Sequence, residues 1–568
     1  MPAENLFQVK GGAMQISKIL ILFILVGIVV GGYFITQKML EDMQSYRENR
    51  GSGLSNSSAE YGDMFVDSSI GDASMLNPIL STDSASADIS GLIFNGLVKY
   101  DKDLKLAGDL AKSWEVSKDG LVITFHLKKD VRWQDGLPFT AADVEFTYKK
   151  LTDPGTKSPY KSAYELVKRF EVLDEYTVRV TYGAPFAPAL ESWGMGILPK
   201  HLLENQDINT AKFNSSPVGT GPFKFSGWSR GEKVTLKASE AYWDGRPYLD
   251  SYLYRIIPDQ SSQLMELKAG GIDSMVLTSD MYANLSKDKT FNEKNNTYRY
   301  TGFNYTYLGF NLNNPLFSDK KVRQAIDLGI NRKEIIDGVL LGYGVESTGP
   351  FLPRSWAYNK NVSWGKFNRE KAMQLLAEAG WADTDKDGIL EKNGKKFEFM
   401  LMTNQGNKQR ELVVQVIQQH LKKLGIKVNI RIIAWSSFIN EFVDKKKFDA
   451  IVMGWQLSPD PDIFDIFHSS KINEKEYNFV SYKNAEVDKL LVEGRTTFDL
   501  EKRKKAYNRV HEIIAEDLPY VFIYVPDTLV AIDKRVQNIK VEAAGIRYNF
   551  EKWYVPKGTQ KYKNEIQK

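Results

Sequence analysis

The alternation of apolar and polar residues predicts intermixed strands and helices from about residue 62 onward. In the run LVITFHL at 121–127, apolar residues occupy every second position, and the preceding Asp119–Gly120 pair predicts the turn of a hairpin. Thr140 then precedes a helical pattern and Asp143 follows three residues later, which is typical of a helix N-cap. This part of the chain is therefore predicted to mix a strand hairpin with at least one helix.

The second half of the chain alternates helix and strand patterns more regularly. Asn368 precedes a helical run that stops at Gly380, and the residues that lead to Gly425 repeat apolar side chains at helical spacing. The segment VNIRIIAW at 428–435 then alternates as a strand, and two further helical patterns precede strand-like sequence at 519–532. Helix and strand in succession are typical of an α/β lobe, so we expect the fold class α/β.

An apolar segment lies near the N-terminus. Residues 19–35 form a run of 17 residues without a charged side chain, which is just long enough to span a bilayer as a helix. Lys10 and Lys18 precede the run, which favours a cytoplasmic N-terminus. No convincing A-x-A cleavage site follows, so we expect an uncleaved anchor rather than a cleaved signal peptide.

Composition and charge narrow the class of protein. With 568 residues, 42% hydrophobic and 26% charged, the chain is ordinary for a globular protein and large enough for at least two lobes. The small net charge of +4 does not support a nucleic-acid partner. The absence of cysteine excludes disulfides, thiolate nucleophiles, cysteine-ligated metal centres and a lipidated N-terminal cysteine.

Several segments form an ordered set of motifs spread over about residues 64–554. They are LNP at 76–78, IFNGLVKYD at 93–101, LAKSWEVSKDGLVITFHLKKDVRWQDGLPFTAADVEFTY at 110–148, GTGPFKF at 219–225, AYWDGRPYLD at 241–250, FSDKKVRQAIDLGINRKEI at 317–335, LLAEAGW at 375–381 and GWQLSPDPDIF at 454–464. In this order and spacing they resemble the extracytoplasmic solute-binding proteins of ABC transporters, specifically the dipeptide- and oligopeptide-binding family (family 5).

The resemblance implies a two-lobed periplasmic-binding-protein-like fold of type II, with an extra subdomain in lobe I and, here, one N-terminal transmembrane helix before it. The expected divisions are a cytoplasmic N-terminus at 1–18, a transmembrane helix at 19–36, a flexible linker at 37–61, lobe I at 62–304 with its subdomain at about 101–217, lobe II at 305–524, a return to lobe I at 525–557 and a tail at 558–568. Two crossover strands, near 305–310 and 520–525, would form the hinge about which the lobes close.

The resemblance further implies an extracytoplasmic receptor that binds a peptide between the lobes. It would deliver the peptide to an ABC permease, whose ATPase subunits supply the energy, because this chain has no P-loop. We expect a monomer without a cofactor. A hydrolase is not expected, since the chain contains no G-x-S-x-G motif, no H-E-x-x-H motif and no cysteine nucleophile.

The loop that follows the apolar strand FDAIVMGW is the main candidate for ligand contact. In peptide-binding relatives, an Asp three residues after the matching Trp accepts the α-ammonium group of the ligand, but here that position is Ser458. A hydroxyl gives no charge-assisted pairing, so an oligosaccharide or a nickel chelate remains an alternative ligand. The candidate ligand-binding residues are Ser84, Ser86, Asn304, Tyr305, Trp435, Trp455, Gln456, Ser458 and Asp460.

A separate acidic stretch, DTDKDGILE at 383–391, begins like a calcium-binding loop. Asp383, Asp385 and Asp387 have the D-x-D-x-D-G spacing, and Glu391 follows. The bidentate glutamate of an EF-hand belongs at position twelve, which is Gly394 here. A hairpin turn is therefore the favoured interpretation, and a structural calcium ion is the alternative.

Overall fold

The structure is a computed structural model that describes residues 59–363 and 366–562, and from Glu60 onward the chain forms one compact unit. The predicted transmembrane segment at 19–36 and most of the predicted linker lie outside the described residues. Within the described ranges, no helix combines the length and the apolar character that a membrane span requires.

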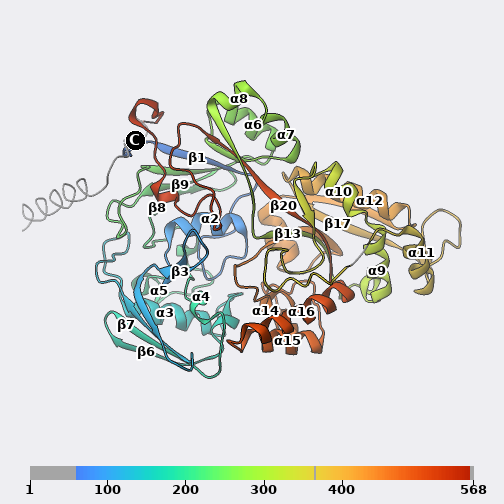
Figure 1. Cartoon of the computed structure of the whole chain (residues 1–568), viewed down its shortest axis with the longest axis horizontal. Coiled ribbons are helices and arrows are strands. Elements are labelled where there is room, and N and C mark those ends of the chain that lie inside the picture. Colours follow the sequence, from blue (N-terminus) through green and yellow to red (C-terminus); the bar gives the residue numbers. More distant parts are fainter. Residues whose placement is uncertain (1–58, 364–365, 563–568) are drawn as a thin grey trace, which may run out of the picture. The chain divides into compact units, whose positions relative to one another are not determined.

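One sheet runs through this unit, and a single long strand is shared by its two halves (Figure 1). The shared strand, β20 (Tyr520–Asp533), pairs through its first half with β13 (Asn304–Phe310) and β14 (Gly344–Glu346). Its second half pairs with β11 (Ser274–Val276) and β12 (Asn295–Thr301). We call the body on the β11 and β12 side lobe I and the body on the β13 and β14 side lobe II.

Lobe I is built on a mixed sheet in the order β8-β9-β10-β1-β11. Strand β1 is parallel to β10 and β11, while β8, β9 and β10 are antiparallel neighbours. The remaining elements of this part are β1 (Met64–Ser69), α2 (Ser84–Ile93), β8 (Phe223–Ser229), β9 (Lys233–Ala238), β10 (Ser251–Ile256), α6 (Gln260–Ala269), α7 (Ser279–Leu285) and α8 (Lys289–Lys294).

A separate antiparallel sheet in the order β4-β5-β7-β6 lies within the range 101–217 expected to form an extra subdomain. The pairing of β4 with β5 confirms the predicted hairpin, and β5 buries every second residue. The elements here are β2 (Val98–Tyr100), β3 (Leu106–Gly108), β4 (Ala111–Val116), β5 (Val122–Leu127), α3 (Ala141–Thr152), β6 (Val167–Asp174), β7 (Thr177–Tyr182), α4 (Ala189–Ser192) and α5 (Lys200–Leu203).

Lobe II continues from β20 through β13, β19, β17 and β18. The predicted helix before Gly425 and the strand after it are confirmed as α12 and β18, and Asn368 caps α11 as predicted. The elements are α9 (Lys320–Gly329), α10 (Arg332–Gly338), α11 (Arg369–Glu378), β15 (Glu391–Lys392), β16 (Lys395–Lys396), β17 (Glu398–Asn404), α12 (Lys408–Lys422), β18 (Lys427–Ile433), α13 (Trp435–Ser437), β19 (Ala450–Gln456), α14 (Phe464–Phe467), α15 (Ala485–Arg495) and α16 (Leu500–Asp517).

The sheet of lobe II is buried on both faces. Along β20, Tyr520 and Phe522 pack into one apolar core, and Val521 and Ile523 pack into the core on the opposite face. Successive side chains of a strand point to opposite faces, so this continuous apolar run is what a central strand with two covered faces requires.

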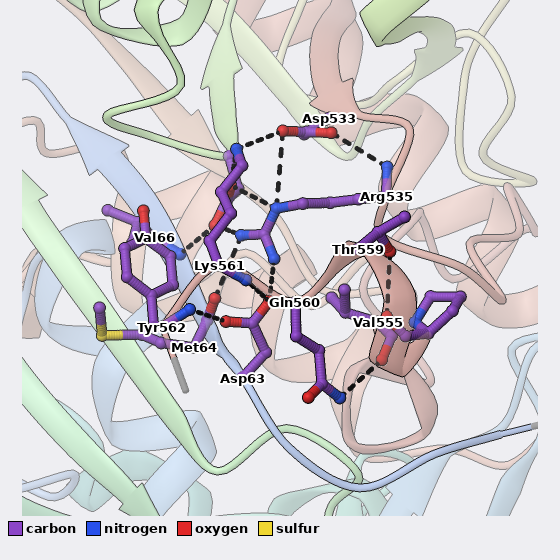
Figure 2. Close-up of polar contacts among 12 residues, drawn as sticks. Asp63, Met64, Val66, Asp533, Arg535, Val555, Thr559, Gln560, Lys561 and Tyr562 are labelled. Carbon is purple, nitrogen blue, oxygen red and sulfur yellow. Dashed lines mark hydrogen bonds and ion pairs between the residues drawn. The ribbon is translucent and has the colours of Figure 1, made fainter. Parts of the chain in front are cut away.

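The chain after β20 returns to lobe I and is fixed there by charge. Figure 2 shows Arg535 and Lys561 beside Asp63 and Asp533. Arg535 also pairs with the buried carboxylate of Asp273, whose pKa is raised by burial. These ion pairs therefore hold the segment after β20 against the start of β1 in lobe I.

Candidate functional site

A cavity of about 480 Å³ lies between the two lobes. Its wall on the lobe I side comes from α2, from the residues just after α2 and from the segment around α4. Its wall on the lobe II side comes from the loop after β19, from α14 and from the end of α15. Figure 1 shows α4 next to α14 and α15, so residues far apart in the sequence meet here.

Two of the four carboxylates in the cavity wall are held by arginines. Both carboxylate oxygens of Asp460 accept hydrogen bonds from Arg503 Nη2, at 2.7 and 2.9 Å. Asp462 lies 2.8 Å from Arg495 Nη2, and burial raises the pKa of its carboxyl group. The charges of this loop are thus neutralised within lobe II.

The other two carboxylates, Glu191 and Asp465, form no ion pair with any residue that the structure describes. Glu191 lies on α4, shares a hydrogen bond with the Ser458 hydroxyl, and has a pKa raised mainly by burial. Asp465 lies on α14, and burial raises its pKa to about 6. One oxygen of Asp465, Oδ1, is buried without a hydrogen-bond partner in the described ranges. The cavity therefore carries an excess of negative charge.

The predicted residues of lobe II lie in or near this wall. Ser458 and Asp460 line the cavity. Trp455 and Gln456 end strand β19 and are absent from the cavity lining. The Trp455 indole stacks on Phe479, and its Nε1 donates to Tyr520 Oη at 3.3 Å.

The predicted residues on the first crossover strand occupy different environments. Asn304 begins β13 opposite Gln456, and its Oδ1 is buried without a hydrogen-bond partner within the described residues. Tyr305 has no exposed surface and packs against Tyr307 and Phe522, so its ring contributes to the core of lobe II. Neither residue lines the cavity.

The predicted residues around the start of α2 include structural hydrogen-bonding groups. Asp83 caps the helix by accepting from Ser86 N at 3.0 Å, and the Ser86 hydroxyl donates to Asp83 at 2.6 Å. Ser84 is exposed in the first turn of the helix. Trp435 Nε1 of lobe II donates to Asp83 at 3.2 Å, so this region joins the two lobes.

Further contacts join the lobes. Tyr477 Oη donates to Tyr160 Oη at 2.9 Å, and Lys471 lies 3.2 Å from Glu165. Gly71 of lobe I lies very close to Trp435. A Cβ atom added to Gly71 would be only 2.6 Å from the Cβ atom of Trp435. The structure therefore has the lobes in direct contact around the cavity.

Sequence reasoning missed Glu191, Asp465 and Arg495. No motif surrounds Glu191, and its position opposite Ser458 is a product of the fold. Asp465 directly follows the GWQLSPDPDIF motif, so the reasoning that made the loop after the apolar strand a ligand candidate also applies to it.

The acidic stretch 383–391 lies in lobe II, before the β15–β16 hairpin. Asp383, Asp385, Asp387 and Glu391 each place one carboxylate oxygen so that all four lie within 4.8 Å of one another. An antiparallel bridge between Ala382 and Glu391 closes the acidic stretch into a loop, and the β15–β16 hairpin turns after it, at residues 393–394. The geometry also brings together every acidic residue of the predicted calcium loop.

The family can be decided by comparison with known proteins. The family model of bacterial extracellular solute-binding proteins, family 5 Middle, matches residues 105–474. The oligopeptide-binding protein AppA of Bacillus subtilis (strain 168) is 41% identical over 529 residues, which are 89% of this chain and 95% of AppA. This chain belongs to family 5 of the bacterial extracellular solute-binding proteins.

Solved structures of family members agree with the fold. AppA from Bacillus subtilis, in complex with a nonapeptide, has a TM-score of 0.83 at 39% identity, over 88% of this chain and 99% of that one. NikZ from Campylobacter jejuni, in complex with Ni(L-His), has a TM-score of 0.78 at 32% identity, over 88% of this chain and 100% of that one. DppA from Helicobacter pylori, in complex with the peptide STSA, has a TM-score of 0.80 at 28% identity, over 88% and 99%. The predicted family and the two-lobed α/β fold are confirmed.

Proposed function

We propose that this family 5 protein is an extracytoplasmic receptor that binds a peptide between its lobes and delivers it to an ABC permease. The observation that carries the proposal is the acidic cavity, in which Glu191 and Asp465 form no ion pair within the described residues, although the charges of Arg495 and Lys471 act on Asp465 from nearby. The α-ammonium group of a peptide is the complementary charge. AppA and DppA, both similar to this chain, were solved with peptides bound.

In this proposal, the Glu191 carboxylate accepts a hydrogen bond from the ammonium group of the peptide. Ser458 is unable to form this ion pair because its hydroxyl is uncharged. The Ser458 hydroxyl contacts Glu191, so the position that carries an Asp in peptide-binding relatives is occupied here by a serine bonded to a carboxylate from lobe I. A ligand held by Glu191 on one side and Asp465 on the other would touch both lobes at once. Such a ligand stabilises the closed form through contacts that exist only there.

The hinge is proposed to consist of β13 and the first half of β20, with the lobes divided near residues 304 and 525. Both strands are buried and pair with each other, with a register shift between Thr306 and Tyr307. The predicted residues that do not line the cavity would then act in lobe closure rather than in ligand contact. Trp435, whose Nε1 donates a hydrogen bond to Asp83, is the main example.

The apolar run at 19–35 is proposed to retain the receptor at the outer face of the cytoplasmic membrane. The length of the run and the two lysines before it support an uncleaved anchor. Mass spectrometry of the protein from a membrane fraction tests this, because loss of residues 1–36 would show cleavage.

The ligand is tested by titration calorimetry of the full-length protein in detergent. Peptides from dipeptides to nonapeptides are compared with Ni(L-His) and with oligosaccharides. Saturable heat with peptides that have a free amino terminus supports the proposal, and heat only with the chelate or a sugar overturns it. Mass spectrometry of the released ligand is expected to show an unaltered peptide, while a cleaved one would contradict a receptor without catalysis.

A further inference from the structure

The acidic loop of lobe II has features of a cation site that is separate from the ligand cavity. It lies between α11 and β17, and none of its residues lines the cavity. Its four carboxylates offer oxygens within 4.8 Å of one another. Calcium binds oxygen at 2.3–2.6 Å, so ligands on opposite sides of one ion are roughly 5 Å apart, which matches this span.

Glu391 gives an independent indication of a missing partner. Its residue surface is only 9% exposed, and its Oε2 accepts from the backbone N of Thr384 at 2.9 Å and from the Thr384 hydroxyl at 3.2 Å. Its other oxygen, Oε1, is buried and has no hydrogen-bond partner among the described residues. A buried carboxylate oxygen without a partner is unfavourable, and a bound cation would satisfy it.

The local backbone orients the carboxylates around a common centre. The backbone N of Gly388 donates to Asp383 at 3.1 Å, and the N of Asp387 donates to Asp385 at the same distance. Gly388 has a φ of +87°, which allows the tight turn after the third aspartate. Glu391 is brought back towards the aspartates because it forms an antiparallel bridge with Ala382, at the start of the loop.

One lysine partly neutralises the cluster. Lys396 Nζ lies 3.3 Å from Asp385 and pairs with Asp387. A single ammonium group opposes four carboxylates, so a strong negative charge remains. Lys396 is half-exposed, so it can move into solvent when a cation enters.

We propose that Asp383, Asp385, Asp387 and Glu391 bind one calcium ion, which holds the β15–β16 hairpin to the preceding loop. Calcium fits better than magnesium because a cluster of loop carboxylates suits its flexible coordination, whereas magnesium requires a near-ideal octahedron and retains water. The ion would be structural, since the loop is outside the cavity.

Calorimetry of the full-length, chelator-treated protein with calcium chloride tests the proposal. We expect one site with a Kd of about 10⁻⁴–10⁻³ M, the range of extracellular calcium modules. The double variant Asp385→Asn/Asp387→Asn is expected to weaken binding at least tenfold, and Lys396→Met to strengthen it severalfold by removing the competing charge. Asp385, Asp387 and Lys396 are all exposed, so neither variant is expected to impair folding.

Asp101 and Asp103 provide a matched control, because they have the same D-x-D spacing on an exposed turn but belong to no such cluster in the described chain. The double variant Asp101→Asn/Asp103→Asn should bind calcium like the unmodified protein. Absence of calcium heat, equal binding of magnesium, or unchanged binding in Asp385→Asn/Asp387→Asn would each overturn the proposal. Peptide titrations of the same variant separate this result from a failure of the proposed receptor function.

Discussion

Four carboxylates line the cavity between the lobes, and only two of them have arginine partners. Asp460 and Asp462 lie in the loop that the sequence singles out, yet Arg503 and Arg495 neutralise both. Glu191 and Asp465 form no ion pair among the described residues, and burial raises the pKa of both carboxyl groups, so a cationic ligand would favour their ionised forms. The partners of a carboxylate, rather than its place in a motif, therefore decide whether it is free to bind.

Replacing Glu191 by glutamine is expected to weaken the binding of peptides with a free amino terminus by about 10- to 150-fold. The loss corresponds to one charge-assisted hydrogen bond, about 1.5–3 kcal/mol. Calorimetric Kd values measure the effect, and peptides with an acetylated amino terminus should bind both proteins alike. Glu204→Gln, an exposed acid of the same subdomain, is the control. Equal losses for free and acetylated peptides would refute the ammonium contact.

Asp465 predicts a pH dependence of stability and binding. The folded pKa of about 6 lies above the ordinary value of 3.8, so ionising this carboxyl destabilises the unliganded fold as pH rises from about 4 through 6. Asp465→Asn should therefore raise the unfolding temperature at pH 7.5 and leave it unchanged near pH 4.

Ionisation of Asp465 should strengthen peptide binding, although it destabilises the unliganded fold. An ammonium group pairs only with the ionised carboxylate, so peptide affinity of the unmodified protein should fall as the pH is lowered from 7.5 to 5. In Asp465→Asn this dependence should be weaker, and affinity at pH 7.5 lower. Parallel pH profiles of the two proteins would contradict the role of Asp465.

At the scale of the element, helix α3 shows how a local signal becomes a tertiary contact. Thr140 and Asp143 form the predicted N-terminal cap as a reciprocal capping box. Asp143 also accepts from the backbone N of Lys200 at 3.0 Å and from Trp133 Nε1 at 3.3 Å. One side chain thus begins the helix and ties it to two neighbouring segments of the subdomain.

Thr140→Ala is expected to lower the free energy of unfolding by about 1 kcal/mol, the usual effect of removing an N-cap side chain. Urea denaturation of the full-length protein measures the change. Thr152→Ala, at the other end of the same helix, removes an equal number of atoms but no cap, and should change stability by less than about 0.5 kcal/mol. Equal effects of the two substitutions would show that the cap contributes little.

At the scale of the whole molecule, the contact between the lobes depends on close packing at a few points. Gly71 and Trp435 are the tightest example, since a Cβ atom on Gly71 has no room beside the tryptophan. The backbone φ of Gly71 is not in the left-handed region, so alanine is acceptable within lobe I itself. A substitution there opposes closure without disturbing the fold of the lobe.

Gly71→Ala is accordingly expected to weaken peptide binding by about 5- to 150-fold, which corresponds to an overpacking cost of about 1–3 kcal/mol. Small-angle scattering with saturating peptide should give a larger radius of gyration than for the unmodified protein. Gly338→Ala, where a Cβ meets nothing within 4 Å, is the matched control. Unchanged affinity in Gly71→Ala would mean that ligand binding does not need this closed contact.

Much of the fold was predictable because it follows from local patterns. The caps at Thr140 and Asn368, the helix before Gly425 and the strand at 520–533 all depend on residues near one another in the chain. The candidate site was less predictable. Of the residues that sequence comparison favoured, Ser458 and Asp460 line the cavity, whereas Tyr305 is fully buried in a core.

The sequence alone determined the family, the α/β class and the absence of cysteine chemistry, because these depend on composition, periodicity and ordered motifs. Only the tertiary structure decided which charges are available to a ligand. Glu191 and Ser458 are 267 positions apart, and their contact exists because two lobes meet around a cavity. Whether a carboxylate is neutralised depends on which distant arginine the fold brings to it, and no local pattern contains that information.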